Sequence, residues 1–222
     1  MADAARTALL AGATGLVGSH CLSQLLSDPA YGRVVTVVRR PLPLGDPKLD
    51  TRVVDFDRLA DADLPRVDDV YCALGTTIRR AGSRDAFRRV DHGYVVALAR
   101  RAAERGAARF VLVSAIGADA RSPVFYSRVK GETERDVAAV GFEAVHLLRP
   151  SLLVGERSEH RPGERLMIGL FTRLAPLLVG PLRRYRPIAA EVVARAMRVV
   201  ARRDERGTHV HESDRIAALG TA

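Results

Sequence analysis

Continuous apolar runs alternate with amphipathic segments along most of the chain. Runs rich in valine and leucine, without polar interruptions, are typical of strands buried on both faces of a parallel sheet. The runs that we interpret as such strands are residues 8–11, 34–38, 52–54, 70–74, 110–113 and 145–148. Apolar residues at helical spacing lie between them and predict helices over residues 16–26, 84–105 and 126–140. This alternation predicts an α/β fold of the Rossmann type, a doubly wound, mostly parallel sheet with helices on both faces.

The last third of the chain is less regular. A polar loop begins near residue 156, and an apolar helix follows it up to about residue 182. A final helix is predicted over residues 188–203, and residues 208–211 could add an edge strand. No internal repeat or linker separates these pieces. We therefore expect one domain over residues 1–222, in which a small region around 150–188 covers the substrate.

The net charge of +9 over 222 residues would suit nucleic acid, an anionic membrane or a phosphorylated ligand. However, the basic residues are spread along the chain, and only Lys48 and Lys130 are lysines. The densest run, Arg183, Arg184 and Arg186, is interpreted as a solvated face. We therefore expect a small-molecule substrate, with no specific nucleic acid and no membrane as partners.

Signals for secretion, for a membrane span and for a metal site are missing from the sequence. There is neither a secretory leader nor a membrane span, which predicts a cytoplasmic location. Cys21 and Cys72 lie in apolar segments without CxxC spacing and are interpreted as buried thiols. His146, in an apolar strand, is interpreted as a core residue, and no pair of histidines has the spacing of a metal site. No metal is expected.

A glycine-rich turn follows the first predicted strand. Its glycines form a GxxGxxG pattern between that strand and a helix. Glycines at this junction allow a tight turn, so that backbone N–H groups and the positive end of the helix dipole can meet a pyrophosphate. The sequence therefore predicts a dinucleotide site formed by Gly12, Ala13, Thr14, Gly15, Leu16, Val17 and Gly18.

The residues after the second predicted strand bear on the choice of dinucleotide. About 20 residues after the glycine loop, an acidic side chain marks the ribose 2′-hydroxyl of NAD. This chain has Arg39 and Arg40 there instead. A guanidinium can bind a 2′-phosphate, which an acid would repel. NADP, as NADPH, is therefore favoured over NAD, with an ordinary surface position for Arg39 as the alternative.

Tyr126 and Lys130 lie four residues apart at the start of a predicted helix and therefore share one of its faces. A nearby cation lowers the pKa of a phenol from about 10, which makes proton transfer near neutral pH easier. Ser114, at the end of the preceding strand, could hold a substrate oxygen. These three are the candidate catalytic residues, and a solvated helix pair is the alternative interpretation.

With TGxxGxxG, a serine that ends the fifth strand and YxxxK in this order, residues 8–150 resemble the short-chain dehydrogenase/reductase superfamily. Leu148–Ser151, Gly155–Glu159 and Arg161–Glu164 are similar to an atypical subgroup, the NAD(P)-binding oxidoreductases typified by the Tat-interacting protein. With these segments, the resemblance extends over nearly the whole chain.

The resemblance implies a role for each candidate residue. Tyr126 would be the general acid, and Lys130 would bind the nicotinamide ribose and ease the ionisation of Tyr126. Ser114 would polarise the carbonyl group of the substrate. The glycine turn and Arg39 would hold the phosphates. Further cofactor contacts would come from Arg40 beside Arg39, from Asp55 and Phe56 at the adenine, and from Ala73, Leu74 and Gly75 along the cofactor.

The sequence also departs from the superfamily. Many members use an asparagine on the fourth helix in a proton relay, whereas this chain contains no asparagine. Asp91 and His92 occupy that region. His92 could take the place of the asparagine, although a helix-surface position is the simpler interpretation.

The favoured function is an NADP-dependent oxidoreductase that transfers hydride between the nicotinamide and a small carbonyl or hydroxyl substrate. A second hypothesis is an NAD(P)(H)-sensing regulatory protein with little or no turnover, because the subgroup is also associated with protein partners. A homodimer is compatible with either hypothesis. A nucleotide-sugar epimerase or dehydratase fits less well, since its relatives carry a larger C-terminal lobe than the roughly 70 residues after position 150 can build.

Overall fold

Seven parallel strands form the central sheet of the structure, a computed structural model that describes residues 5–155 and 178–221. Their order across the sheet is β3-β2-β1-β4-β5-β6-β9, and each neighbouring pair runs parallel. The strands are β1 (Arg6–Ala11), β2 (Tyr31–Val38), β3 (Leu49–Val53), β4 (Asp69–Cys72), β5 (Arg109–Val113), β6 (Ala144–Arg149) and β9 (Gly207–Glu212). This sheet confirms the predicted Rossmann-type, doubly wound fold.

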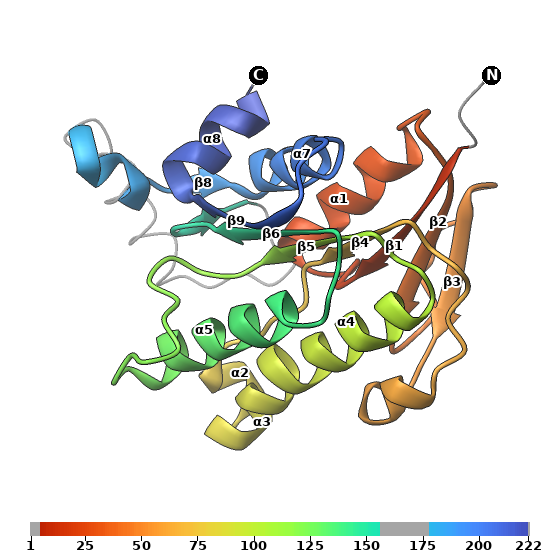
Figure 1. Cartoon of the computed structure of the whole chain (residues 1–222), viewed down its shortest axis with the longest axis horizontal. Coiled ribbons are helices and arrows are strands. Elements are labelled where there is room, and N and C mark those ends of the chain that lie inside the picture. The colour runs from red at the N-terminus through yellow and green to blue at the C-terminus, as the bar shows by residue number, and fades with distance from the viewer. Residues whose placement is uncertain (1–4, 156–177, 222) are drawn as a thin grey trace.

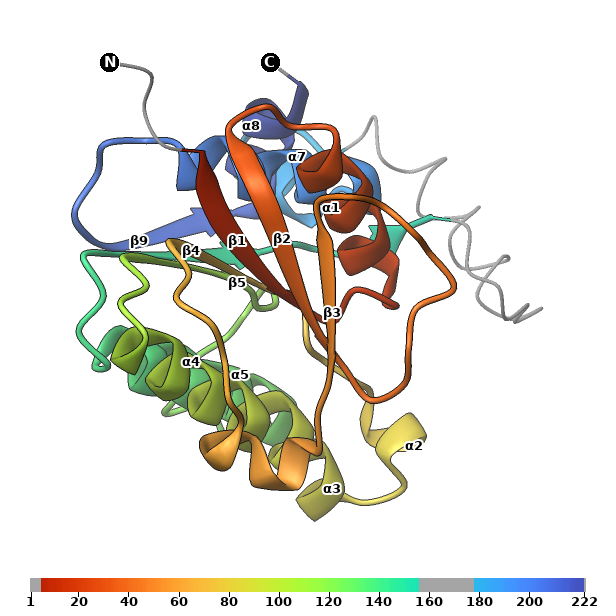
Figure 2. The ribbon, with the colours of Figure 1, turned by 90° about the vertical axis from the view of Figure 1, so that its right-hand side faces the viewer.

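Helices cover both faces of the sheet (Figures 1 and 2). One face carries α1 (Leu16–Leu26), α7 (Ala190–Ala201) and α8 (Ser213–Thr221). The opposite face carries α4 (Val95–Glu104) and α5 (Phe125–Ala138), with the short α2 (Ile78–Ala81) and α3 (Arg84–Arg88) beside them. Each face has its own apolar core, so Leu10 packs in one core and its neighbour Leu9 in the other. Because successive residues point to opposite faces, both of them buried, the strands are continuous apolar runs in the sequence.

The end of the chain differs from the prediction at two points. Ile188 and Ala189 form a short strand, β8, which pairs with β7 (Leu153–Val154) in a separate two-stranded sheet. The final helix, predicted from residue 188, therefore begins at Ala190 as α7. The expected edge strand is present as β9, and α8 after it was not predicted. Two 3₁₀ turns, η1 (Phe56–Asp61) and η4 (Gly180–Tyr185), complete the described elements.

The helix predicted over residues 84–105 is divided into three parts. α3 ends at Arg88, a π-helical turn, η2 (Arg89–Tyr94), follows, and α4 begins at Val95. The apolar periodicity continues through all three parts, so it could not reveal the interruption. Turns of the π type are rare and are often found at functional sites.

Part of the region expected to cover the substrate lies outside the described residues. This applies to Glu156–Glu159, to Arg161–Glu164 and to most of the apolar helix expected up to residue 182. The single-domain organisation and the covering role of residues 150–188 therefore stay predictions. Within the described part of the chain, no helix is both long and apolar enough to cross a membrane.

The start of α1 packs very closely on the end of β1. A Cβ atom placed on Gly18 would lie 2.0 Å from the backbone oxygen of Gly12. A Cβ atom on Gly12 would lie 2.5 Å from the backbone oxygen of Ala73, and Gly12 has a φ of +88°, in the left-handed region. Only glycine therefore fits at Gly12 and Gly18 without a movement of the backbone.

A stack of histidine rings lies where β6 pairs with β9. His146 is fully buried, and its Nδ1 lies 3.2 Å from Nε2 of His211. The ring of His209 stacks on His146 with 5.3 Å between centroids. Burial, followed by repulsion from His211 and His209, lowers the pKa of His146 from 6.5 to about 4. The folded protein therefore keeps His146 neutral, in agreement with its predicted core position.

Gly18→Ala should lower the free energy of unfolding by about 3 kcal/mol or more, because the new methyl group meets backbone atoms that cannot rotate away. Thermal unfolding followed by circular dichroism measures the change. Gly45→Ala is the matched control, since a Cβ atom there would meet nothing within 4 Å. Equal melting temperatures for the two variants would contradict the close packing of α1 on β1.

Acid should destabilise the protein through His146. As the pH falls below about 6.5, the unfolded chain takes up a proton on this histidine before the folded chain does. Its contribution to stability is complete above pH 6.5 and is lost between pH 6.5 and about 4. From pH 7.5 to pH 5 the loss amounts to about 2 kcal/mol, measurable by urea unfolding.

The control for this loss is a pair of variants compared at the same two pH values. His146→Leu should reduce the difference in unfolding free energy between pH 7.5 and pH 5 by about 2 kcal/mol. His20→Gln, on α1 and outside the histidine stack, should leave that difference unchanged. If His146→Leu retains the full difference, another group is responsible.

Candidate functional site

The predicted site residues follow the carboxyl ends of neighbouring strands. Gly12 follows β1, Arg39 follows β2, Ala73 follows β4 and Ser114 follows β5. Because the strands are parallel, these ends lie along one edge of the sheet. The chain leaves β1 toward β2 on one side and later returns to β4 on the other, so the switch point of the sheet lies between β1 and β4. Ligands of such sheets bind in the crevice outside this point.

The glycine turn has the backbone geometry that a phosphate group needs. The N–H group of Gly15 donates to the oxygen of Gly12 at 2.9 Å, which closes the turn. α1 then begins at Leu16 without a side-chain cap and without an acidic residue in its first turn. Thr14 and Gly15 are exposed. The uncapped N–H groups at this helix end therefore lie next to two exposed residues at the positive end of the helix dipole, an arrangement that suits an anion.

The residues expected near the adenosine lie after β2 and β3. Arg39 and Arg40 are both exposed and follow β2 directly. After β3, Oδ1 of Asp55 accepts a hydrogen bond from the backbone N–H of Asp57 at 3.0 Å and thereby caps η1. Phe56 is buried, with its ring centroid 5.5 Å from that of Tyr94. One oxygen of Asp55 is therefore engaged in the protein, and Phe56 anchors this loop to the sheet.

α5 carries the predicted tyrosine and lysine. Tyr126 lies in its first turn, half-buried, with its ring centroid 5.5 Å from that of Phe87. One turn later Lys130 is buried, with 7% of the residue exposed, and its Nζ lies 2.7 Å from Oδ1 of Asp91 on η2. A Cβ atom on Gly75 would lie 3.6 Å from the same Nζ, so Lys130 reaches the loop after β4.

Burial disfavours the charge on Lys130, but the attraction of Asp91 and of the Tyr126 phenol outweighs it and raises the pKa of Lys130 above 10.5. The other oxygen of Asp91, Oδ2, accepts a hydrogen bond from the backbone N–H of Thr76 at 2.8 Å. Lys130 is therefore a cation at neutral pH, held in place by a carboxylate that is itself fixed to the loop after β4.

Ser114 presents a polar atom without a partner. The residue is 7% exposed, and among the described residues its Oγ has no hydrogen-bond partner. Its backbone N–H donates to the oxygen of Leu148 at 2.7 Å, which holds it at the end of β5 beside β6. A buried hydroxyl group without a partner costs free energy, so this position suits a ligand oxygen.

Arg149, from the segment similar to the atypical subgroup, orients α5. Its Nε donates to Oε1 of Glu134 at 3.0 Å and its Nη2 donates to Oε2 at 2.5 Å, a paired contact that is mostly buried. Its Nη1 also contacts Glu212 on β9 at 3.3 Å. Because Glu134 lies one turn after Lys130 on α5, this contact fixes the helix that carries the candidate catalytic pair.

Asp91 and Thr76 are site residues that the sequence did not identify. Only the lack of asparagine and the position of Asp91 on the fourth helical segment pointed toward this region. His92, the next residue on η2, instead contacts α5, where its Nε2 is 2.8 Å from Oδ2 of Asp136. Asp91, rather than His92, therefore occupies the interior of the site beside Lys130.

Comparisons with known proteins agree with this geometry. A family model described as NAD(P)H-binding matches residues 12–153, which include the glycine turn, Ser114, Tyr126 and Lys130. The protein fmp52, mitochondrial, of Aspergillus clavatus is 42% identical over 163 residues, 70% of this chain and 70% of that protein. Its namesake from Eremothecium gossypii is 36% identical over 165 residues, 74% of each chain.

The names of these relatives correct one prediction. Both are called mitochondrial, which contradicts the expected cytoplasmic location. That expectation was wrong because it rested on the lack of a secretory leader and of a membrane span. Neither lack distinguishes the cytoplasm from another compartment.

Solved structures share the fold at low sequence identity. MoeE5 in complex with UDP-glucose and NAD has a TM-score of 0.68 and 21% identity, over 97% of this chain and 81% of that chain. The human epimerase family protein SDR39U1 with NADPH has a TM-score of 0.62 and 18% identity, over 93% and 74%. The fold is therefore that of proteins solved with either nicotinamide dinucleotide.

The glycine turn at the switch point of the sheet, the buried lysine on α5 and the family match over more than half of the chain lead to the same assignment. The chain belongs to the NAD(P)H-binding family, in agreement with its resemblance to the atypical short-chain dehydrogenases/reductases.

Proposed function

We propose that this protein is an NADP-dependent oxidoreductase that transfers hydride between the nicotinamide and a small carbonyl or hydroxyl substrate. The observation that carries the proposal is the inner face of α5, where buried Lys130 reaches the loop after β4 and Tyr126 lies one turn away. Binding of a dinucleotide alone has no chemical need for a phenol beside a fixed cation.

The described residues fit a dinucleotide on two observations. The turn at Gly12 and the uncapped start of α1 form a cradle of backbone N–H groups that a Cβ atom would fill. The Ser114 hydroxyl is buried and without a partner at the same edge of the sheet. The glycine turn and Arg39 would hold the phosphates, Asp55 and Phe56 would adjoin the adenine, and Lys130 would hold the nicotinamide ribose.

When bound, the nicotinamide supplies or accepts the hydride. In the direction of reduction, the phenol of Tyr126 donates its proton to the carbonyl oxygen while the carbonyl carbon receives the hydride, so a carbonyl group becomes a hydroxyl group. Ser114 donates a hydrogen bond to the same oxygen and orients it. Lys130, kept charged by Asp91, stabilises the negative charge that forms on Tyr126 as the proton leaves.

The preference for NADP is supported by charge at the carboxyl end of β2. Arg39 and Arg40 are exposed there, and neither makes an ion pair with a described residue. A free guanidinium at this place attracts a 2′-phosphate and offers it two N–H donors.

Arg39→Asp should weaken NADPH binding by about ten- to a hundredfold and leave NADH binding within about threefold, because the lost contact is a charge-assisted one to the 2′-phosphate. Cofactor fluorescence titration measures both constants. Arg183→Asp, which changes the net charge equally on η4, is the control. An unchanged ratio of NADPH to NADH affinity in Arg39→Asp would reject the assignment.

Tyr126→Phe should lower turnover by about a hundredfold or more, the usual scale of a positioned general acid, and leave NADPH binding unchanged. The ring and its packing on Phe87 are kept in this variant. NADPH oxidation is measured against a panel of aldehydes, ketones and quinones, with binding measured in parallel. Lys130→Met should impair both properties, since that side chain is assigned to the ribose and to the phenol.

The same experiment separates an enzyme from a cofactor sensor. If the wild-type protein turns over no member of the panel and Tyr126→Phe changes neither binding nor a partner interaction, the reductase proposal fails. An NAD(P)(H)-sensing role would then replace it.

A further inference from the structure

Asp91 is presented to the site by an irregular part of the helix. α3, η2 and α4 follow one another without a break, and η2 is the π turn between them. A π turn contains an extra residue compared with an α-helical turn, so it displaces the side chains that it carries. Asp91, third residue of η2, is 1% exposed in spite of its charge.

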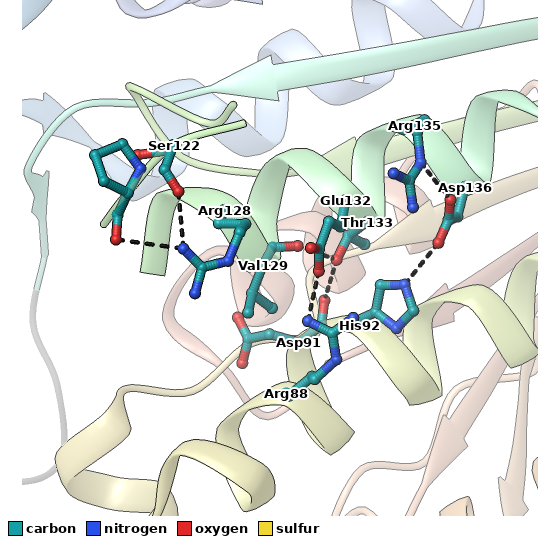
Figure 3. A network of polar contacts seen from close by, with 11 residues as sticks. Arg88, Asp91, His92, Ser122, Arg128, Val129, Glu132, Thr133, Arg135 and Asp136 are labelled. Atoms are coloured by element: carbon teal, nitrogen blue, oxygen red, sulfur yellow. Dashed lines mark hydrogen bonds and ion pairs between the residues drawn. The ribbon is translucent and has the colours of Figure 1, made fainter. Parts of the chain in front are cut away.

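Contacts from either side of Asp91 fasten η2 to α5 (Figure 3). They are the ion pair of Arg88 with Glu132 at 2.5 Å, the contact of His92 with Asp136 at 2.8 Å, and the hydrogen bond from the Thr133 hydroxyl to the Asp91 backbone oxygen at 2.9 Å. Together they hold the backbone of η2 against the helix that carries Lys130. By fixing the backbone of η2, these contacts also fix the position of the Asp91 side chain.

Both oxygens of the Asp91 carboxylate are engaged inside the site. Oδ1 lies 2.7 Å from Nζ of Lys130, and Oδ2 accepts from the N–H of Thr76 at 2.8 Å. A Cβ atom on Gly75 would lie 3.4 Å from Oδ1, which places the pair directly behind the loop after β4. The Asp91 side chain is not exposed to solvent, so its charge acts on Lys130 and on this loop.

We propose that Asp91 is a positioning residue, whose carboxylate fixes the Lys130 side chain as a cation behind Gly75. Asp91 thereby keeps a positive charge one helical turn from Tyr126 while the phenol donates its proton in carbonyl reduction. This consequence rests on the proposed reductase function, whereas the fixing of Lys130 does not.

Among the groups around Lys130, only a carboxylate can balance the charge of its ammonium group. The titratable groups that act on its ammonium are Asp91 from η2, Tyr126 from its own helix and Cys72 from β4. Burial raises the pKa of Cys72 to about 12, so its thiol is neutral near pH 7. Asp91 is therefore the only fixed negative charge among these groups. An amide at its place could still accept the hydrogen bond from the Thr76 N–H but would leave the buried Lys130 ammonium without a counter-charge.

Lysine NMR tests the fixing of Lys130 directly, without any substrate. The chain has only two lysines, so protein labelled with ¹³C at the lysine ε-carbon gives two signals, and Lys48→Arg assigns them. In the wild-type protein we expect the Lys130 signal to titrate above about 10.4, the ordinary pKa of a lysine side chain. In Asp91→Asn we expect the Lys130 midpoint to fall by two pH units or more, because burial is then unopposed.

His92→Gln is the matched control, because it removes another contact between η2 and α5 and leaves the Asp91 carboxylate in place. Its Lys130 midpoint should equal that of the wild type. An equal midpoint in Asp91→Asn and wild type would overturn the proposal. Should Asp91→Asn not fold, as judged by circular dichroism, the wild type still decides: a Lys130 midpoint below about 10.4, the ordinary lysine value, would also overturn the proposal.

The pH dependence of kcat/KM for carbonyl reduction tests the consequence at Tyr126. Reduction needs a charged Lys130, so the loss of its proton lowers kcat/KM at alkaline pH, in the alkaline limb of the profile. We expect Asp91→Asn to move this limb to lower pH by at least one unit, and His92→Gln to leave it in place. An unmoved limb in an active Asp91→Asn would overturn the consequence. If the wild type reduces nothing while Lys130 titrates as expected, the reductase function fails and the fixing of Lys130 stands.

Discussion

The buried ion pair of Lys130 and Asp91 is the constraint on which the candidate site depends. Removing two charges from water is expensive, and a pair in the protein interior is tolerated only when the geometry is close and the remaining polar atoms have partners. Here the Nζ to Oδ1 distance is 2.7 Å, and the Thr76 N–H takes the second carboxylate oxygen. Loss of one partner from such a pair costs about 3 to 5 kcal/mol. The pair therefore holds η2, α5 and the loop after β4 in one arrangement.

The other half of the site depends on contact between backbones. Where β1 passes into α1, Gly12 and Gly18 let the chain approach itself and Ala73 more closely than any side chain would allow. The loop after β4 takes part in both the backbone contact and the ion pair. Its Ala73 adjoins the glycine turn, and its Gly75 adjoins Lys130. The two halves of the site are therefore set by different physical causes and meet at the loop after β4.

Much of this arrangement could be predicted from sequence because its signals are local. Continuous apolar runs indicated strands buried on both faces, and a strand, a glycine turn and a helix in succession indicated the start of the sheet. The spacing of Tyr126 and Lys130 placed them on one helix face. The role of Asp91 had no such signal, because its partner Lys130 lies 39 residues away on another helix. The π turn that presents it leaves the apolar period of residues 84–105 uninterrupted.

Transfer of deuterium from NADPH labelled at C4 of the nicotinamide, on the face that is transferred, tests the central claim most directly. The wild-type protein is incubated with labelled NADPH of each C4 configuration and with aldehydes and ketones, and the products are analysed by mass spectrometry. The account predicts an alcohol with one deuterium on the former carbonyl carbon, from one of the two cofactors only. Bound NADPH that keeps its deuterium with every substrate would contradict it.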